Sequence, residues 1–345
     1  MERTLIYLTL VATLLVNSSF LTRTGHASKG GTLSFVDYNE SANIYLIDST
    51  GENFQKLTTD DVPKHALTWS PDGHSFAYQS KVAGMLDIYV MDVRKKESRQ
   101  LTNHPSRNLR PAWAPNGKWI AFVSDRAGSL DIYRVDVDGS NLMRLTNHGT
   151  DGTAAWSPDS KRIVYDSYQG GNHEAGLPGK HFLCVMDADG SGKRKLLQDM
   201  NISGCTWSPD GKQIAYAAGI TGREGVNIII TDANGNKRRN LTQVGRNGWA
   251  RSPTWSPDGK SIAYFLAILP KMMPGERIEA TKFWADNVIC VINVKGENKG
   301  EPLEATRKIS SSPMWVPETF FSVSPSAEKQ SVLWGTLKAP EINTQ

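Results

Sequence analysis

The sequence predicts an all-β protein in which one four-stranded antiparallel sheet is repeated along the chain. Two observations predict it: a recurring Trp-Ser-Pro-Asp-Gly motif, and the same order of short apolar segments after each copy. Full copies are Trp69–Gly73, Trp207–Gly211 and Trp255–Gly259, near copies begin at Trp113 and Trp156, and a worn sixth begins at Trp315. Successive Trp residues are 44, 43, 51, 48 and 60 positions apart. A recurrence of about 40 to 50 residues is typical of a repeat architecture.

The segments after each motif have the composition of strands. An apolar stretch comes first, then a second stretch that ends near an Asp, then a polar turn and a short segment containing Leu-Thr. The first stretches are 75–78, 119–123, 163–165, 214–216 and 262–265, and the second stretches are 87–92, 131–136, 182–187 and 227–232. Four short strands with turn signals between them form one antiparallel sheet, and such sheets repeated radially are the blades of a β-propeller.

The two ends of the chain predict how the propeller closes. Residues 32–58 supply the last three strands of a blade, and residues 313–317 supply a first strand without a blade after it. Together they complete one blade, so we expect six four-stranded blades in a ring closed by strands from both termini, which leaves no open sheet edge. The expected blades are 31–59 with 312–325, 64–105, 108–149, 152–199, 202–245 and 251–310.

The motif itself has a structural interpretation. Ser, Pro and Gly at its second, third and fifth positions fit the first, second and fourth corners of a tight turn between the first and second strands. The preceding Trp is a large apolar plate, so we expect it to pack between neighbouring sheets.

These residues resemble the TolB-type propeller repeat, a relative of the WD repeat. The shared signature is Trp-Ser-Pro-Asp-Gly, then Ile-Ala-Phe/Tyr, then Asp-Ile-Tyr-Val-Met-Asp, then Leu-Thr, and it covers about residues 31–325. The resemblance implies a non-catalytic propeller that binds a protein segment. TolB carries a smaller α/β domain ahead of its propeller. Only about thirty residues precede the first repeat here, so we expect that domain to be absent.

The N-terminal segment of the chain predicts secretion. Residues 1–27 have a basic Arg3, an apolar stretch and small residues at Gly25 and Ala27, as in a secretory signal. A membrane anchor is the alternative, but the stretch is short and rich in polar residues for a span. We therefore expect a signal peptide at 1–27, a propeller at 28–325 and a tail at 326–345. The mature protein would be periplasmic or secreted, without a membrane span, and monomeric.

Composition excludes some partners. Removing residues 1–27 would leave 37 basic and 34 acidic residues, a balance too mild to indicate nucleic acid. The three cysteines Cys184, Cys205 and Cys290 are too few and too scattered for a disulfide framework, so we expect small buried side chains.

No enzyme motif stands out. The chain has no Gly-x-Ser-x-Gly elbow, no P-loop and no His-Glu-x-x-His sequence, so we expect no catalysis and no cofactor. Three histidines in blade connections, His65, His104 and His148, are weak metal-ligand candidates, with ordinary loop hydrogen bonding as the alternative. The Asp-x-Asp-Gly turns at 136–139 and 187–190 lack the further oxygens of a calcium site and fit hairpin turns.

One face of the propeller is the expected binding face. The irregular insertions, at 166–181, 219–226 and 266–287, all join second to third strands and so share a face with the blade connections. Basic and apolar side chains lie in the same connections and insertions. The candidate residues are His65, Arg107, Arg110, Arg246, Trp249, Arg251, Leu269, Met272, Met273 and Trp284.

The sequence therefore predicts a secreted or periplasmic scaffold that binds a protein segment or peptide at the mouth of the propeller channel. The competing hypothesis is a metal-dependent lyase or hydrolase that acts on an extracellular glycan.

Overall fold

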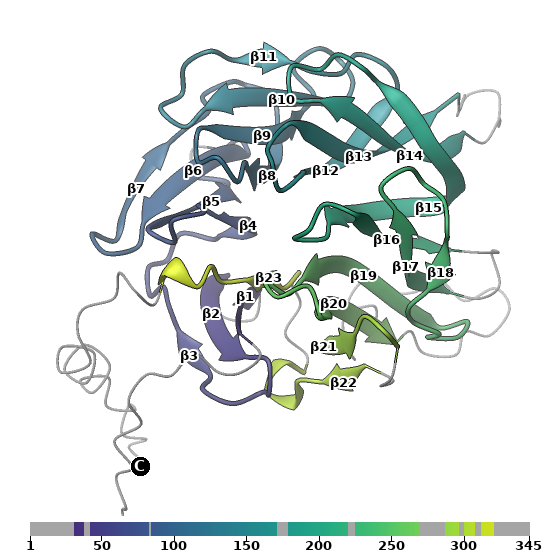
Figure 1. Cartoon of the computed structure of the whole chain (residues 1–345). Helices are drawn as coiled ribbons and strands as arrows, with labels where there is room; N and C mark the ends of the chain where they lie inside the picture. Colours follow the sequence, from purple (N-terminus) through teal and green to yellow (C-terminus); the bar gives the residue numbers. More distant parts are fainter. Residues whose placement is uncertain are drawn as a thin grey trace, which may run out of the picture. The chain divides into compact units, whose positions relative to one another are not determined.

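The computed structural model describes residues 31–37, 42–82, 84–170, 179–219, 225–268, 287–296, 300–307 and 312–320. These residues form antiparallel β-sheets and a single turn of 3-10 helix at Glu304–Thr306. The expected all-β class is confirmed. The predicted signal peptide and the C-terminal tail lie outside the described residues. In Figure 1 the sheets follow one another around a common centre, with β4, β8, β19 and β23 toward it.

Three sheets have four strands each. One combines both ends of the described chain in the order β23-β1-β2-β3, and the other two are β4-β5-β6-β7 and β8-β9-β10-β11. The strands are β1 (Thr32–Asp37), β2 (Asn43–Asp48), β3 (Gln55–Lys56), β4 (His65–Trp69), β5 (Ser75–Ser80), β6 (Asp87–Asp92), β7 (Glu97–Gln100), β8 (Asn108–Trp113), β9 (Trp119–Ser124), β10 (Asp131–Asp136), β11 (Met143–Arg144) and β23 (Met314–Trp315).

The remaining strands form one sheet of eleven, which contains the last three repeats. They are β12 (Thr150–Trp156), β13 (Arg162–Gln169), β14 (Lys180–Asp187), β15 (Arg194–Trp207), β16 (Gln213–Gly219), β17 (Val226–Asp232), β18 (Arg239–Asn240), β19 (Gly248–Trp255), β20 (Ser261–Ile268), β21 (Asn287–Asn293) and β22 (Glu301–Pro302). The 14-residue β15 belongs to two repeats, because its first part pairs with β14 and its second part with β16. Strands β17 and β19 meet through one parallel pair.

The motif turns have the predicted geometry. In the first copy the Gly73 amide donates to the Ser70 carbonyl at 3.0 Å, and the Ser70 hydroxyl donates to the Asp72 carboxylate at 2.6 Å. Gly73 has a φ of 69°, a left-handed conformation that favours glycine. Turns of neighbouring repeats touch, since a Cβ on Gly211 would lie 3.6 Å from Pro158. The motif turns therefore lie side by side on one face of the molecule.

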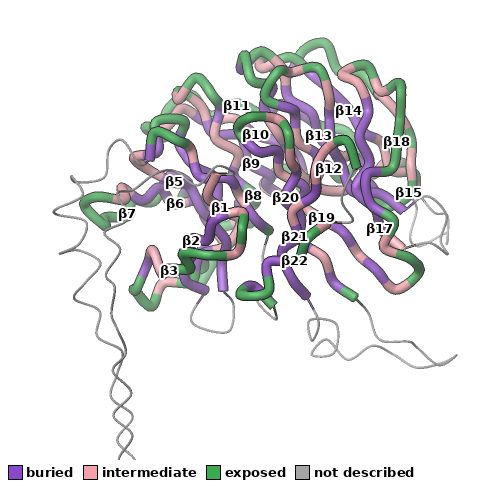
Figure 2. Tube along the Cα trace, turned by 60° about the horizontal axis from the view of Figure 1, so that its bottom comes forward, coloured by how far each residue is buried: buried purple, intermediate pink, exposed green. Residues whose placement is uncertain are grey.

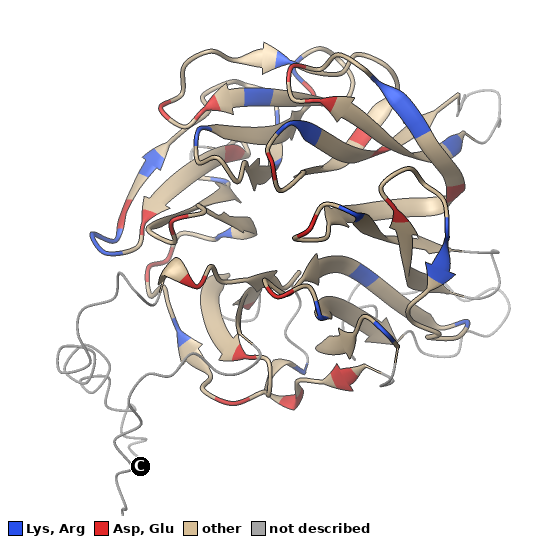
Figure 3. Ribbon diagram, viewed as in Figure 1, with Lys and Arg blue, Asp and Glu red and all other residues tan. Residues whose placement is uncertain are grey.

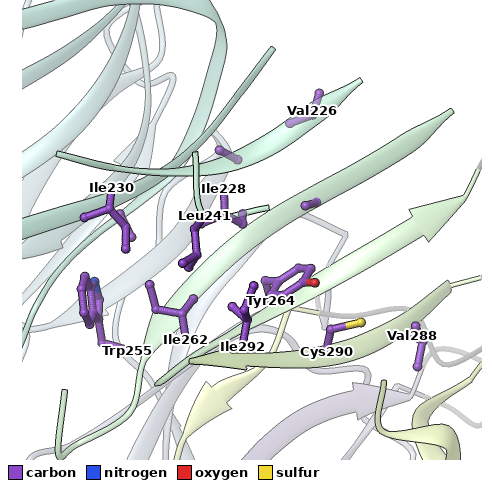
Figure 4. Packing of buried hydrophobic residues seen from close by; sticks show 13 residues of the cluster. Val226, Ile228, Ile230, Leu241, Trp255, Ile262, Tyr264, Val288, Cys290 and Ile292 are labelled. Carbon is purple, nitrogen blue, oxygen red and sulfur yellow. The ribbon is translucent and has the colours of Figure 1, made fainter. Parts of the chain in front are cut away.

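The motif tryptophans pack between sheets, as predicted. Five of the six are buried; Trp113 is half-buried. Trp156 Nε1 donates to the Ala112 carbonyl of the preceding repeat at 3.0 Å, and Trp315 Nε1 donates to the Thr254 carbonyl at 3.0 Å. Figure 4 shows one such layer, where Trp255 and Ile262 of one repeat face Ile230 and Leu241 of the repeat before it. In Figure 2 buried residues follow the strands and exposed ones gather at the turns.

The Leu-Thr pair lies just past the fourth strand rather than inside it. Strand β7 ends at Gln100, but Leu101 still donates to the Ile88 carbonyl at 2.8 Å. The following Thr has a second role, because the Thr102 hydroxyl accepts the Ile88 amide at 2.9 Å. The same bond recurs at Thr58, Thr146, Thr242 and Thr306. In these five repeats the Thr therefore links the end of the fourth strand to the third.

The three cysteines are buried. Cys184 and Cys290 lie in β14 and β21, and Cys205 lies in β15. Burial raises the pKa of Cys184 to about 12 and that of Cys290 to about 11. All three therefore act as small core side chains, as expected.

One junction between repeats contains two buried carboxyls where the preceding junction has a carboxyl and an amide. Asn108 and Asp151 each stand five residues before a motif Trp, and their amides donate to Leu86 and Leu130 at 2.7 and 2.8 Å. Asn108 Nδ2 donates to Asp87 Oδ1 at 2.9 Å. Neither carboxyl oxygen of Asp151, nor Oδ1 of Asp131 opposite it, has a well-formed hydrogen bond among the described residues.

Burial, with Asp131 as a further contribution, raises the pKa of Asp151, while the hydroxyls of Ser167 and Thr146 and the charge of His148 oppose the shift. A protonated Asp151 can donate a hydrogen bond as Asn108 does. The folded state therefore binds a proton that the unfolded state releases near pH 4, and stability falls as the pH rises above that value.

Replacing Asp151 with Asn should supply the missing donor at every pH. We expect the variant to gain about 1 to 2 kcal/mol of unfolding free energy at pH 7.5, because it fills an unsatisfied buried position. Urea titrations between pH 4 and 8 measure this, and the fall in stability with pH should become shallower. Asn108→Asp is the mirror control, which should create the same dependence. A less stable Asp151→Asn variant at pH 7.5 would show that the wild-type pair is satisfied without a proton.

Removing β23 should expose the edge of β1. Leu33 and Ser34 of β1 pair with Trp315 and Met314. A chain that ends at residue 311 should therefore lose about 3 to 5 kcal/mol, the typical cost of deleting one buried Trp, and should associate through its open edge. The control chain ends at Phe320 and keeps β23. Equal melting temperatures and monomeric behaviour for both chains in calorimetry and light scattering would contradict this.

Candidate functional site

The innermost strands of five repeats contain a β-bulge at the same place. The register breaks lie three residues or so before each motif Trp, between His65 and Thr68, Leu109 and Ala112, Asp151 and Ala154, Ser203 and Thr206, and Arg251 and Thr254. In four of these bulges the residue three before the Trp has a left-handed φ: Ala66, Arg110, Gly204 and Ser252. Bulges re-aim side chains, and strained backbone of this kind gathers at binding sites.

The re-aimed residues of successive repeats approach one another. A Cβ on Gly204 would lie 3.2 Å from the Ser252 Cα, and the Ser252 and Ser312 hydroxyl oxygens are 2.7 Å apart. We call the residues three before each motif Trp the central ring. Its members are Ala66, Arg110, Thr153, Gly204, Ser252 and Ser312. The side chains of the central ring are small and uncharged except that of Arg110, which is exposed.

Asp166 lies next to this ring. Its Oδ1 accepts the Thr153 amide at 2.8 Å, and a Cβ on Gly152 would stand 2.0 Å from its Oδ2. Burial raises the pKa of Asp166 to about 6, although the Thr153 amide and the Arg110 charge act in the opposite direction. The side chain keeps some accessible surface even though protein surrounds it densely. Burial of this kind disfavours the charged form of a carboxyl.

Arg251 is the second basic group near the ring. Its guanidinium lies 4.2 Å from the centre of the Trp249 ring, a cation–π arrangement. Its Nε is buried and has no hydrogen-bond acceptor among the described residues. Burial lowers the pKa of Arg251, and it also lowers that of His65. Both are therefore partly desolvated basic groups.

The other predicted residues have varied surroundings. The Arg107 amide and Nε both donate to the Asp125 carboxylate at 2.8 Å, so this Arg is already paired. Arg246 is exposed in the turn before β19. Leu269, Met272, Met273 and Trp284 lie outside the described residues. The structure thus places His65, Arg110, Trp249 and Arg251 at the same end of the inner strands.

The predicted insertions are shorter than the sequence indicated. Strand β13 continues to Gln169 and β14 begins at Lys180, so both ends of the expected 166–181 insertion belong to strands. Strand β20 likewise continues to Ile268, three residues into the expected 266–287 insertion. The 219–226 connection has nearly the expected bounds, since β16 ends at Gly219 and β17 begins at Val226. The pairing of the second and third strands in these repeats therefore extends beyond the segments that recur in the sequence.

The three candidate histidines do not form a ligand set. His65 begins β4, His148 is exposed, and His104 Nδ1 accepts the Ser106 amide at 3.2 Å in an ordinary loop hydrogen bond. Within the described ranges, no group of three His, Cys, Asp or Glu residues could hold a metal ion. Over the same ranges, no helix is long and apolar enough to cross a membrane.

The sequence did not predict two features of the site. The first is the central ring, and the second is Asp166, which lies inside β13. Aligning the repeats on the motif Trp and reading three positions upstream would have found the ring, because Arg110 is the one charged residue at that position. Nothing in the sequence marks Asp166 as facing the ring.

Comparisons with known proteins agree with the fold. A family model described as the TolB beta propeller domain matches residues 12–178, starting within the predicted signal peptide. TolB from Acinetobacter baumannii has a similar structure with a TM-score of 0.63 and 22% identity, over 84% of this chain and 67% of that one. No curated protein sequence matches.

Two further solved structures are similar. A putative TolB from Agrobacterium tumefaciens gives a TM-score of 0.59 and 17% identity, over 79% of this chain and 88% of that one. An oligogalacturonate lyase in complex with manganese gives 0.52 and 16%, over 79% and 73%. At these identities the likeness concerns the fold.

The close approach of Gly152 and Asp166 can be tested by adding a methyl group. Gly152→Ala should push the carboxyl from its bond with the Thr153 amide and cost about 1 to 3 kcal/mol of stability, as overpacking does. In an Asp166→Ala background the same change should cost less, because the clash is gone. Urea denaturation of the four proteins in this cycle measures the coupling. Equal costs in both backgrounds would contradict the contact.

Proposed function

Because the chain is a TolB-type β-propeller, we propose that it is a non-catalytic scaffold that binds a protein segment or peptide at the mouth of a central channel. The observation that carries the proposal is the convergence of basic and aromatic side chains on one end of the inner strands. Arg110 projects from the central ring, and Arg251 lies over Trp249 beside it. Arg and Trp are the residue types that dominate binding hot spots.

The proposal includes a ring of six blades closed by both ends of the chain. It is supported by the pairing of β1 with β23 and by the contact between the two ends of the repeat series. Thr319 Oγ1 donates to the Pro71 carbonyl at 3.1 Å, and a Cβ on Gly73 would lie 2.5 Å from the Phe320 backbone. The last motif turn therefore lies against the first, as closure requires.

The setting we propose is the periplasm or the outside of the cell, with residues 1–27 removed as a signal and the protein monomeric. The basis is the sequence of that segment and the fold shared with TolB structures. In this setting the partner would be a protein of the cell envelope or a secreted protein.

A second candidate is a metal-dependent lyase or hydrolase acting on a glycan. The observation that favours it is the similar fold of the manganese-bound oligogalacturonate lyase. One fold hosts many functions, so this likeness sets a hypothesis for the chemistry without supplying a site. The basic groups His65 and Arg251 would be its candidate substrate contacts.

Photo-crosslinking tests the scaffold. A photoreactive residue at position 110 or 251 should give adducts with an envelope protein in cells, and one at Lys212, on the face of the motif turns, should give none. Replacing both Arg110 and Arg251 with Ala should weaken binding of the identified partner by about tenfold or more, as expected for hot-spot residues. Adducts that form at position 212 and not at 110 would place the binding site on the opposite face.

Metal analysis separates the two candidates. We expect protein purified without added metal to contain no stoichiometric zinc or manganese, and chelators to leave its melting temperature unchanged. We also expect no cleavage of oligogalacturonate with manganese present. Stoichiometric metal together with cleavage would reject the scaffold in favour of the lyase, and His65→Ala would then locate the site.

A further inference from the structure

We propose that the mouth of the channel binds a carboxylate group of a peptide segment, with Arg251 as the principal contact and Arg110 as the second. This inference rests on the proposed function and specifies the chemistry of its partner. The source of the carboxylate is an acidic side chain or a free C-terminus.

The first argument is the incomplete solvation of Arg251. A guanidinium has five donors, and burial without acceptors carries a free-energy cost. Here Nε is buried without an acceptor among the described residues, and one face of the group is covered by Trp249. A carboxylate that pairs with the terminal nitrogens of this guanidinium would offset the cost of its partial burial, because the two groups match in geometry.

The second argument is the orientation imposed by stacking. Contact with the Trp249 ring limits the directions in which the guanidinium can turn, so less conformational entropy is lost when a ligand binds. The same contact covers part of the aromatic face. This ring is therefore less available as a stacking platform for a sugar, which favours a peptide over a glycan as the occupant.

The third argument is the local balance of charge. In Figure 3 acidic and basic residues alternate over the sheets rather than gather in one patch. At the mouth, the charge of Arg110 acts on the Asp166 carboxyl, whereas Arg251 Nε has no acceptor among the described residues. Asp166 also accepts the Thr153 amide at 2.8 Å. Arg107 does not contribute to this balance, because it is paired with Asp125.

The fourth argument is position. Arg110 lies in the third repeat and Arg251 in the sixth, three positions apart. In a ring of six these repeats face each other across the channel. An extended segment that enters the mouth would then pass between the two cations, and a carboxylate would meet Arg251 first because that group is the less solvated one.

The test uses labelled model peptides and the full mature chain. The probe is fluorescein-labelled hexaglutamate with an amidated C-terminus, the neutral comparison is the matching hexaglutamine, and anisotropy measures binding. We expect hexaglutamate to bind and capped hexaglutamine not to bind. Hexaglutamine with a free C-terminus distinguishes the two sources, since comparable binding of that peptide assigns the site to a chain terminus.

Three variants locate the contact. Arg251→Met keeps a long side chain over Trp249 and removes the charge, and it should weaken hexaglutamate binding about tenfold or more, as loss of a hydrogen bond to a charged group does. Arg110→Ala should have a smaller effect in the same direction. Arg194→Ala is the matched control, because it removes an exposed arginine next to the Asp189–Gly190 turn, away from the mouth. Circular dichroism and melting temperature verify folding of each variant.

The inference is overturned if neither hexaglutamate nor hexaglutamine with a free C-terminus binds better than capped hexaglutamine, or if Arg194→Ala weakens binding as much as Arg251→Met. Tighter binding of oligogalacturonate than of hexaglutamate would also overturn it in favour of a glycan. Its failure is distinguishable from failure of the proposed function. Crosslinks at the mouth combined with charge-independent binding reject only the carboxylate, whereas crosslinks on the motif-turn face reject the site itself.

Discussion

Packing of the motif tryptophan against the neighbouring repeat is the interaction on which the rest of this structure depends. Each Trp ends an inner strand, and where its indole nitrogen is satisfied the bond crosses to another repeat, as from Trp69 to Ser34 at 2.8 Å. The indole side chain therefore sets the distance between neighbouring sheets, and the turn after the Trp sets where the second strand begins. The bulge upstream then determines which residue reaches the centre. Site residues are consequently positioned by a layer of packing some distance from them.

This dependence explains why the site tolerates irregular residues. Strands and turns recur because each repeat must fit its neighbours, but the residue three before the Trp lies at the centre, where Gly204, Ser252 and Ser312 approach one another. Ala66, Gly204 and Ser252 are small there, while Arg110 is large and charged. A scaffold of this kind can change its central residues without altering the layer that holds the sheets together, which is how one fold supports different functions.

The sequence was sufficient for the repeat, for the motif turns and for the burial of the tryptophans, because each of these has a local chemical signal. It was insufficient for the central ring, since a left-handed backbone at Ala66 or Arg110 uses residues that give no sign of it. Asp166 was missed because it lies within a strand that continues past the repeat, inside what looked like a loop. Arg107 was predicted to lie on the partner-binding face, but Asp125, 18 residues further along the chain, pairs with it. Tertiary partners of this kind cannot be deduced from spacing alone.

Because the fourth and fifth repeats share strand β15, we expect them to unfold together. Elsewhere a fourth strand is followed by a connection before the next inner strand, so each repeat can open by itself, as in other arrays of stacked units. Between Arg194 and Trp207 the backbone runs without a break from the edge of one sheet to the centre of the next. Loosening either end of this strand disturbs ladders on both sides, and amide protons of β14 and β16 would exchange with solvent as one cooperative unit. The fourth and fifth repeats thus form a single element of stability, because one continuous strand rather than a connection joins them.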